Sequence, residues 1–422
     1  MKTWIKLLLA GAGLVTGLLA TLAAYIYLQV DNRIKIEGPS AAFVNSKTIV
    51  RLDSSEISTD SITRHIEQLT RQNHVTGLGV SIVNDGRVVY QQYFGEANHS
   101  KGQPWTAGTI FYGASFSKTM LADVAIQLSN DGLMSLDSPI YKYLHKPLPE
   151  YKTSAIAQFF GANNYDYSDL RDDVRYKKIT AKMCLSHTTG LPNWRWIEPD
   201  RKLKLKFEPG ERYSYSGEGM FLLQMVIEEL SGKNFEELAS DKIFKPLSLQ
   251  RSSFVWQRGY EEHYAIGHDA GGNFLGIPKR NVPNAAGSLS TSLEEFTAYF
   301  TTVLNQQEPR YRLMTTKQVS IPFKQQFGPE ALIETHDNDS IKLGYGFGYG
   351  VYETPFGSAF FKEGHDDGWQ HYAVGFPDKK IALVLMSNSD NAESIFKELI
   401  EFTIGNKYTP WYWENYIPKN LK

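Results

Sequence analysis

A serine and a lysine lie three residues apart at the predicted start of a helix, in the segment Ser115-Phe116-Ser117-Lys118. Apolar residues then recur with the spacing of a buried helical face, at Leu121, Val124, Ala125 and Leu128. Asn130-Asp131-Gly132 provides the stop signal that ends this helix. Residues three apart lie on one side of a helix, so we expect the Lys118 amine to reach the Ser115 hydroxyl near the unpaired N–H groups of the first turn.

This pair has the composition of a nucleophile and its base. A serine attacks well only when an adjacent group takes its proton, and a lysine can be that group if burial lowers its pKa. The motif alone is also typical of a capped helix that carries a solvated lysine. Its interpretation therefore depends on the rest of the chain.

Further motifs lie on both sides of this pair. Gly77 to Val83, with the turn Asn84-Asp85-Gly86, comes before it, and Leu185 to Pro192, Pro209 to Gly217, Ala285 to Ser292 and Gly364-His365 come after it. Together with Ser115 to Lys118, they resemble the serine hydrolases related to class C β-lactamases and D-alanyl-D-alanine carboxypeptidases, a group that includes esterases and D-amino-acid peptidases. The resemblance runs from about Thr59 to Gly405. It implies an α+β fold of the β-lactamase/transpeptidase type: a mixed α/β domain with an antiparallel sheet flanked by helices, and a mainly helical subdomain at about residues 116–284.

The resemblance also implies catalytic roles. Ser115 would form the acyl-enzyme, and Lys118 and Tyr215 would act as one titrating unit in which the proton is not assigned to either residue. The segment from His365 to Gly368 is matched to the family's Lys-Thr-Gly or His-x-Gly strand, so His365 would orient the substrate or move protons. The backbone N–H groups of Ser115 and Gly368 would form the oxyanion hole.

Ser216, Gly217, Asp366 and Asp367 are the candidates for contact with substrate. Gly217 stands where many relatives have an asparagine that bonds the substrate amide, and Asp367 stands where relatives have glycine. A histidine in place of lysine, with two aspartates beside it, lowers the positive potential that attracts a carboxylate. We therefore predict a preference for neutral or amine-bearing esters and D-amino-acid amides over carboxylate-bearing β-lactams. In the alternative interpretation, the aspartates cap the adjoining loop and never meet substrate.

Two functions stay open at this point. One is a membrane-anchored serine hydrolase that acts on an ester, an amide, a D-amino-acid peptide or a β-lactam-like substrate. The other is a catalytically weak relative that binds cell-wall peptides or a protein partner, an alternative that Gly217 and Asp367 keep open. His187 invites a triad with Ser115, but its position before the turn Gly190-Leu191-Pro192 favours a structural role in that loop.

Composition excludes several classes of function. The net charge of −2, with no basic cluster, gives no support for nucleic-acid binding. Cys184 is the only cysteine, so neither an intrachain disulfide nor a cysteine metal site is expected. The chain has no phosphate-binding loop, dinucleotide fingerprint or His-Glu-x-x-His motif, and we expect no cofactor and no metal. Nothing in the sequence indicates an oligomeric state.

The N-terminal residues 1–30 predict a single-pass signal anchor. Leu7 to Val30 is uncharged and long enough to cross a bilayer, and Lys2 and Lys6 precede it, which places the catalytic domain outside the cytoplasm, on the periplasmic face in a Gram-negative cell. The alternative is a cleavable signal and a secreted enzyme. We expect residues 31–58 to form a polar stalk and 59–405 the hydrolase domain. The aromatic tail 406–422 is expected to pack onto this domain, with the membrane interface as the alternative.

Overall fold

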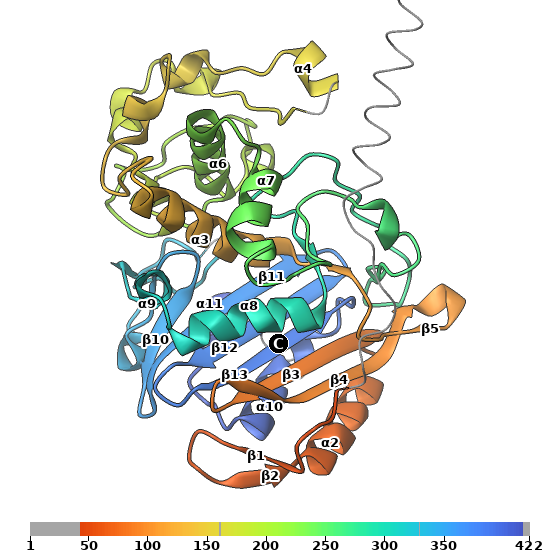
Figure 1. Cartoon of the computed structure of the whole chain (residues 1–422). Coiled ribbons are helices and arrows are strands. Elements are labelled where there is room, and N and C mark those ends of the chain that lie inside the picture. The colour runs from red at the N-terminus through yellow and green to blue at the C-terminus, as the bar shows by residue number, and fades with distance from the viewer. Residues whose placement is uncertain (1–42, 160–161, 329, 417–422) are drawn as a thin grey trace, which may run out of the picture.

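The computed structural model describes residues 43–159, 162–328 and 330–416. Their centre is a nine-stranded antiparallel sheet with helices on both faces and a mainly helical subdomain at one side (Figure 1). In spatial order the strands are β5 (Gln103–Pro104), β4 (Arg87–Asn98), β3 (Gly77–Asn84), β13 (Ile381–Ser387), β12 (Trp369–Phe376), β11 (Gly357–Asp366), β10 (Gly350–Thr354), β9 (Gly344–Tyr345) and β8 (Val319–Ser320). The predicted fold class is therefore confirmed.

The hairpin β3–β4 starts the sheet where the sequence predicts it. Its turn contains Asp85 with φ 49° and Gly86 with φ 70°, and a two-residue hairpin of this kind requires positive φ at both positions. The last strand of the chain, β13, pairs with β3 and places Leu385 opposite Val80. The prediction that the C-terminal strands return to this hairpin is confirmed.

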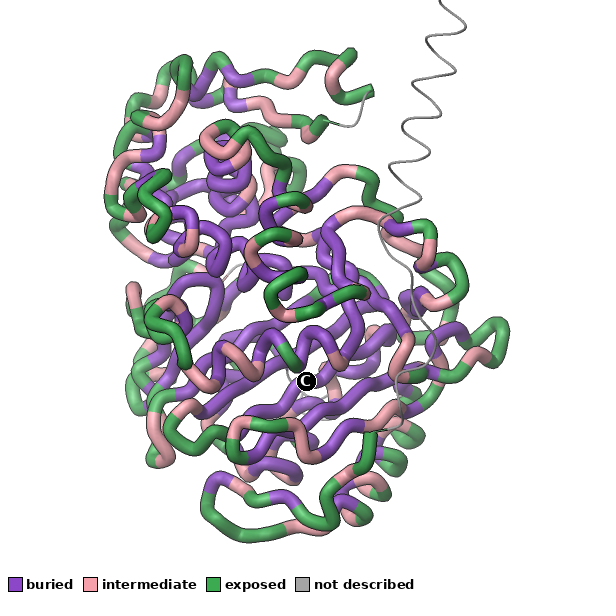
Figure 2. The backbone as a smooth tube through the Cα atoms, viewed as in Figure 1, coloured by how far each residue is buried: buried purple, intermediate pink, exposed green. Residues whose placement is uncertain are grey.

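Successive residues of β13 enter two different cores, because side chains alternate between the faces of a strand. Leu383 and Leu385 pack under α2 (Thr59–Gln72) and α10 (Glu393–Thr403), whose buried faces were both predicted from their apolar spacing. Val384 and Met386 instead join the core beneath α8 (Leu293–Asn305). The sheet is thus buried on both faces, as the purple tube in Figure 2 shows.

The helical subdomain carries the serine–lysine pair. It contains α3 (Ser117–Asn130), α4 (Ala155–Phe159), α5 (Ala181–Leu185), α6 (Gly217–Ser231) and α7 (Phe235–Ala239). The helix α3 ends at Asn130, as its stop signal predicts, and is buried along nearly its whole length (Figure 2). A short pair, β6 (Phe111–Tyr112) and β7 (Ser290–Thr291), leads from the sheet into α3, and α9 (Pro309–Thr315) packs against this helix.

The prediction of an irregular stalk up to residue 58 is wrong for the part that the structure describes. Here β1 (Thr48–Val50) and β2 (Glu56–Ser58) form a paired ribbon. The Asn84 amide bonds both the N–H and the C=O of Val50, and Ile49 is buried in the core below α2. The anchor predicted for residues 1–30 lies outside the described residues. Among the helices that are described, none is both long and apolar enough to span a bilayer.

The described part of the aromatic tail, residues 406–416, packs onto the domain, as the sequence analysis expected. Trp411 and Trp413 of α11 (Trp411–Glu414) are buried against the sheet, with the Trp411 ring 5.2 Å from that of Tyr372. Tyr416 is also buried. This packing brings the end of the described chain back to the cavity that contains Ser115.

Candidate active site

The predicted serine–lysine pair forms. Ser115 lies in a single 3₁₀ turn, η2 (Ala114–Phe116), directly before α3. The Lys118 Nζ lies 3.0 Å from the Ser115 Oγ and 2.6 Å from the Ala286 carbonyl oxygen, so the amine is held on the serine. Ala114 has φ 44°, a left-handed conformation that is costly for a residue with a side chain and that clusters at functional sites.

Tyr215 joins this pair from the loop before α6. Its hydroxyl hydrogen-bonds Ser115, and its ring centroid lies 5.0 Å from the Lys118 Nζ. All three predicted residues therefore meet at one point between the helical subdomain and the sheet.

A second lysine, which the sequence analysis did not single out, completes the group. Lys362 on β11 is fully buried, and its Nζ lies 3.2 Å from the Tyr215 hydroxyl and 2.8 Å from Glu363 Oε1. Lys362-Glu363-Gly364 is itself a Lys-x-Gly sequence, three residues before the segment that we matched to the family strand. That match was therefore three residues late, and the Lys-x-Gly pattern was the signal that would have corrected it.

His365 lies farther along β11 and has a different partner. It lines the cavity near the strand end, as predicted, but half of its side chain is exposed, and its Nδ1 bonds Glu393 Oε1 of α10. Burial alone would lower the pKa of His365, but the hydrogen bond and charge of Glu393 outweigh it and raise this pKa above its ordinary value.

Burial sets the protonation states of the central group. The pKa of Lys118 lies well below its ordinary value, first because the amine is buried and then because the Lys362 charge repels a second one. The pKa of Tyr215 lies well above its ordinary value, because its hydroxyl is buried and faces Glu363. This arrangement favours a neutral Lys118 amine beside a neutral Tyr215 phenol.

The structure does not bring Gly368 to the site, and its predicted part in the oxyanion hole is wrong. Strand β11 continues to Asp366 and turns only at Asp367-Gly368. The Gly368 N–H donates to Asp390 Oδ1 at 2.6 Å and has no freedom to bind a substrate oxygen.

The two predicted aspartates have separate positions. Asp366 lines the cavity, bonds the Tyr112 hydroxyl and accepts the Asp367 N–H at 3.0 Å. Asp367 lies exposed in the turn and is not among the described residues that line the cavity. The alternative that the aspartates cap the loop is thus correct for this turn, while Asp366 also faces the cavity.

Ser216 and Gly217 do not line the cavity, so their predicted contact with substrate is wrong. Ser216 caps α6: its Oγ accepts the Gly219 N–H at 2.8 Å and donates to the Pro192 carbonyl. A Cβ on residue 217 would lie 2.6 Å from the Trp194 ring and 2.7 Å from the Asn193 carbonyl oxygen. Packing therefore requires glycine at this position.

The loop that excludes a side chain at 217 supplies an amide of its own. The Asn193 Oδ1 accepts the Gly217 N–H at 3.1 Å, and both Asn193 and Trp194 line the cavity. The Trp194 ring lies 5.9 Å from the Lys118 Nζ. A side-chain amide is thus present beside the reacting group, contributed by a different segment from the one that the sequence analysis considered.

His187 is not part of a triad. It is buried, its Nδ1 accepts the Ser216 N–H at 3.1 Å, and its ring packs on that of Tyr215 with centroids 4.2 Å apart. Burial and the nearby Lys118 and Lys362 charges lower its pKa well below the ordinary value, so the ring is neutral. The predicted structural role fits: His187 supports Tyr215.

These residues line a cavity of about 390 Å³. Its wall includes four carboxylates from three segments: Glu363 and Asp366 of β11, Glu393 of α10 and Glu414 of α11. A second hollow continues from it past Tyr112, Trp194 and Gly287 toward Lys279 and Arg280. The cleft therefore has an acidic part beside Tyr215 and a basic part farther away.

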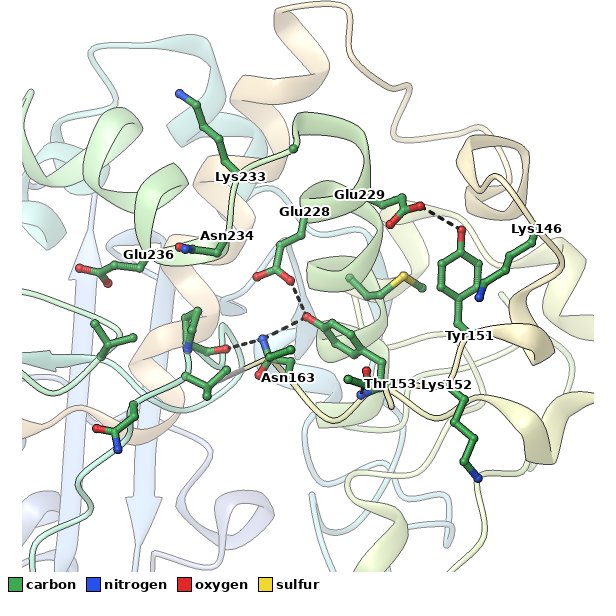
Figure 3. A pocket seen from close by; sticks show the side chains of 18 residues that line it. Lys146, Tyr151, Lys152, Thr153, Asn163, Glu228, Glu229, Lys233, Asn234 and Glu236 are labelled. Carbon is green, nitrogen blue, oxygen red and sulfur yellow. Dashed lines mark hydrogen bonds between the residues drawn. The ribbon is translucent and has the colours of Figure 1, made fainter. Parts of the chain in front are cut away.

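A larger hollow, of about 730 Å³, lies in the helical subdomain and is shown in Figure 3. Its central carboxylate, Glu228, accepts hydrogen bonds from the Tyr165 hydroxyl at 2.7 Å, from Gln224 and from the Phe235 N–H. The described lining contains no serine or cysteine. Residues 151–165 thus contribute to the wall of this separate hollow, and none of them is among the described residues that line the Ser115 cavity.

Comparisons with known proteins agree with this geometry. The beta-lactamase family model matches residues 62–402 of the chain. Protein flp of Staphylococcus aureus (strain N315) is 23% identical over 231 residues, which are 51% of this chain and 42% of that protein. Teichoic acid D-alanine hydrolase of Staphylococcus aureus (strain MRSA252) is 23% identical over 257 residues, or 56% of this chain and 58% of that protein. The chain thus spans less than two thirds of the length of these curated relatives.

Solved structures share the fold at low sequence identity. The octameric penicillin-binding protein homologue from Pyrococcus abyssi superposes with a TM-score of 0.64 at 22% identity, covering 85% of this chain and 79% of that one. D-alanine carboxypeptidase AmpC from Burkholderia cenocepacia gives 0.60 at 18% identity, covering 78% and 93%. With the family model matching most of the chain, and with the serine, lysine and tyrosine meeting in one cavity, the chain belongs to the beta-lactamase family.

Proposed function

We propose that the protein is a serine hydrolase that forms an acyl-enzyme at Ser115 and cleaves a neutral or amine-bearing ester or a D-amino-acid amide. The observation that carries the proposal is the Lys118 amine, which is buried 3.0 Å from the Ser115 hydroxyl and repelled by Lys362. An amine in that environment is neutral and accepts a proton. The resemblance to teichoic acid D-alanine hydrolase and D-alanine carboxypeptidase supports an acyl group of the D-alanine type.

In the proposed reaction, Lys118 takes the Ser115 proton while the Ser115 Oγ attacks the carbonyl carbon. The tetrahedral intermediate then collapses, the bond to the leaving group breaks, and the proton on Lys118 returns to the leaving oxygen or nitrogen, directly or through the Tyr215 hydroxyl. Water repeats the sequence with Lys118 as base and releases the acid. Lys362 orients the Tyr215 hydroxyl at 3.2 Å.

The oxyanion hole is proposed to consist of the N–H groups of Ser115 and His365. Backbone groups of an antiparallel strand alternate between its two edges. Asp366 and Trp369 flank the two-residue turn and bond each other across the hairpin, so the N–H of His365 faces the opposite edge. On that edge the pairing of β11 with β10 ends at Phe361. Beyond Phe361, β11 lies against η2, and a Cβ on Gly364 would be 3.0 Å from the Gly113 carbonyl oxygen. The His365 N–H therefore faces the turn that contains Ser115. Two such donors stabilise the charge that develops on the carbonyl oxygen.

The cavity wall supports the substrate preference. Glu363, Asp366 and Glu393 repel a substrate carboxylate, and of the cations near Ser115, Lys362 is already bound to Glu363. Asn193 offers an amide that would bond a substrate carbonyl or N–H. The preference predicted from Asp366 and Asp367 is thus retained as a proposal, but for a different set of carboxylates.

The test treats residues 31–422 with a fluorophosphonate and measures the intact mass, in parallel with turnover of p-nitrophenyl acetate and of a chromogenic cephalosporin. We expect one adduct per chain, mapped to Ser115, and a higher kcat/KM for the ester than for the cephalosporin. Absence of adduct and of turnover would support the binding protein instead. Faster turnover of the cephalosporin would retain the hydrolase and remove the proposed preference. A membrane anchor at residues 1–30 stays a prediction.

Variants of Lys362 and His365 test which of these two residues assists Tyr215. Lys362→Met is expected to lower kcat/KM for p-nitrophenyl acetate by about 100-fold, because it removes the cation from the Tyr215 hydroxyl. His365→Gln keeps the backbone N–H and is expected to change kcat/KM by about 3-fold or less. Steady-state kinetics with thermal unfolding of both variants decide this. A larger loss in His365→Gln than in Lys362→Met would contradict the reassignment.

A further inference from the structure

Two carboxylates from distant parts of the chain meet in the cavity wall near Tyr215. Glu363 comes from β11 and Glu414 from α11, and both line the cavity that contains Ser115. Glu363 is 4% exposed and Glu414 is 3% exposed. Carboxylates so deeply buried are rare unless they are paired, so their joint presence here needs an explanation.

Gln326 holds the two segments together. Its backbone N–H donates to the Trp413 carbonyl at 2.8 Å, and its side-chain Nε2 donates to Glu363 Oε1 at 3.0 Å. Glu414 is held from the sheet side, where the Tyr372 hydroxyl donates to its Oε1 at 2.8 Å. The position of each carboxylate is therefore set by contacts that do not involve a ligand.

One oxygen of each carboxylate is left over. Lys362 and Gln326 both bond Glu363 Oε1, while Glu363 Oε2 and Glu414 Oε2 are buried and have no hydrogen-bond partner among the described residues. Lys362 supplies one positive charge for two carboxylates. Burial raises the pKa of Glu414 well above its ordinary value, and the Glu363 charge raises it further. The two carboxylates could therefore accept one further cation, which would hydrogen-bond the two free oxygens and balance the second negative charge.

We propose that Glu363 and Glu414 form a subsite for the ammonium group of an amine-bearing substrate. A primary ammonium carries three N–H donors and one positive charge, which matches two carboxylate oxygens without partners in a cavity wall. The inference rests on the proposed function and assigns the amine to this end of the cleft, next to the Tyr215 hydroxyl. It also gives α11 a role: the C-terminal segment supplies half of the subsite.

The test compares isobutylammonium with isobutanol, which has nearly the same shape and no charge, as competitive inhibitors of p-nitrophenyl acetate turnover. We expect the ammonium to bind wild-type protein about 10-fold more tightly, as a charge-assisted contact allows. Glu414→Gln is expected to remove this preference. Glu229→Gln, in the separate hollow of the helical subdomain, is the matched control and is expected to keep it. Equal inhibition of wild-type protein by the two compounds would overturn the subsite.

A second comparison extends the test to substrates. D-alanyl-p-nitroanilide should be preferred over its N-acetyl derivative by wild-type protein and by Glu229→Gln, but not by Glu414→Gln. If Glu414→Gln does not fold, the wild-type preference for isobutylammonium is followed as the pH falls. The titratable groups around Glu414 are Glu363, Lys362, Glu393, Tyr213, Tyr352, Tyr372 and Tyr416. Protonation of a carboxyl with a raised pKa removes its charge, so the preference should decline on acidification; a constant preference would overturn the subsite.

Failure of this inference and failure of the proposed function are distinguishable. Turnover of p-nitrophenyl acetate and the fluorophosphonate adduct report on Ser115 and Lys118 and do not require an ammonium group on the substrate. A protein that turns over the ester but does not prefer the ammonium is a hydrolase without this subsite. If there is no turnover, titration calorimetry with the same two compounds measures the preference directly.

Discussion

Replacing Ser115 by alanine is expected to remove the fluorophosphonate adduct and to lower kcat for p-nitrophenyl acetate by about 10⁴-fold or more, as loss of a nucleophile does in serine hydrolases. The Ser115 Oγ is in contact with both the Lys118 amine and the Tyr215 hydroxyl. The side chain is small and faces the cavity, so its loss should leave the fold intact.

The matched control is Ser129→Ala, on the far turn of the same helix. Its side chain makes no contact with the cavity, and we expect wild-type adduct formation and turnover. Intact-protein mass and steady-state kinetics measure both variants, and circular dichroism checks that each variant keeps the wild-type helix content. An adduct that survives in Ser115→Ala would show that another residue reacts and would contradict the assignment of the nucleophile.

Replacing Lys118 by methionine is expected to lower kcat/KM by about 10³-fold, within the range that a positioned general base contributes. Methionine keeps much of the volume and leaves out the amine that bonds Ser115 and the Ala286 carbonyl. The variant should still fold, since a long apolar side chain suits this buried position. It should also react with the fluorophosphonate far more slowly than wild-type protein does.

The pH profile gives an independent test of the same base. Lys118 acts as a base only when it is neutral, so kcat/KM rises with pH through its pKa and then becomes constant. Because burial and the Lys362 charge lower that pKa, the plateau should begin well below pH 10, where an ordinary lysine would still be protonated. The profile is measured between about pH 5 and pH 10. A value of kcat/KM that still rises at the alkaline end would contradict a lowered pKa of Lys118. Loss of the ascending limb in Lys118→Met would support the assignment.

Lys362→Met should shift the ascending limb of the pH profile to higher pH, in addition to lowering kcat/KM. Without the Lys362 charge, the pKa of Lys118 loses one of the two causes that lower it, so the limb shifts to higher pH. His365→Gln should leave it in place. This readout separates an electrostatic role of Lys362 from a merely structural one.

Local chemistry made several elements predictable. The turn Asp85-Gly86 adopts the positive φ that its residue types favour, and α3 runs from the serine–lysine pair to its stop signal at Asn130. The contact between Lys118 and Ser115 follows from helical spacing alone. Tyr215 was found through the resemblance and not through its spacing. The stalk prediction failed because Asn84 and the core under α2, both distant in sequence, order the segment around Ile49.

The sequence by itself determined the nucleophile, its amine and the family, because these depend on contacts within one turn of helix and on motifs that keep their order along the chain. Only the tertiary structure decided which strand residue reaches Tyr215, because the register of β11 against η2 is set by pairing with β10 and β12. It likewise decided that Trp194 excludes a side chain at 217 and that Glu414 faces Glu363. These residues are tens to hundreds of positions apart, and chain packing alone brings them together.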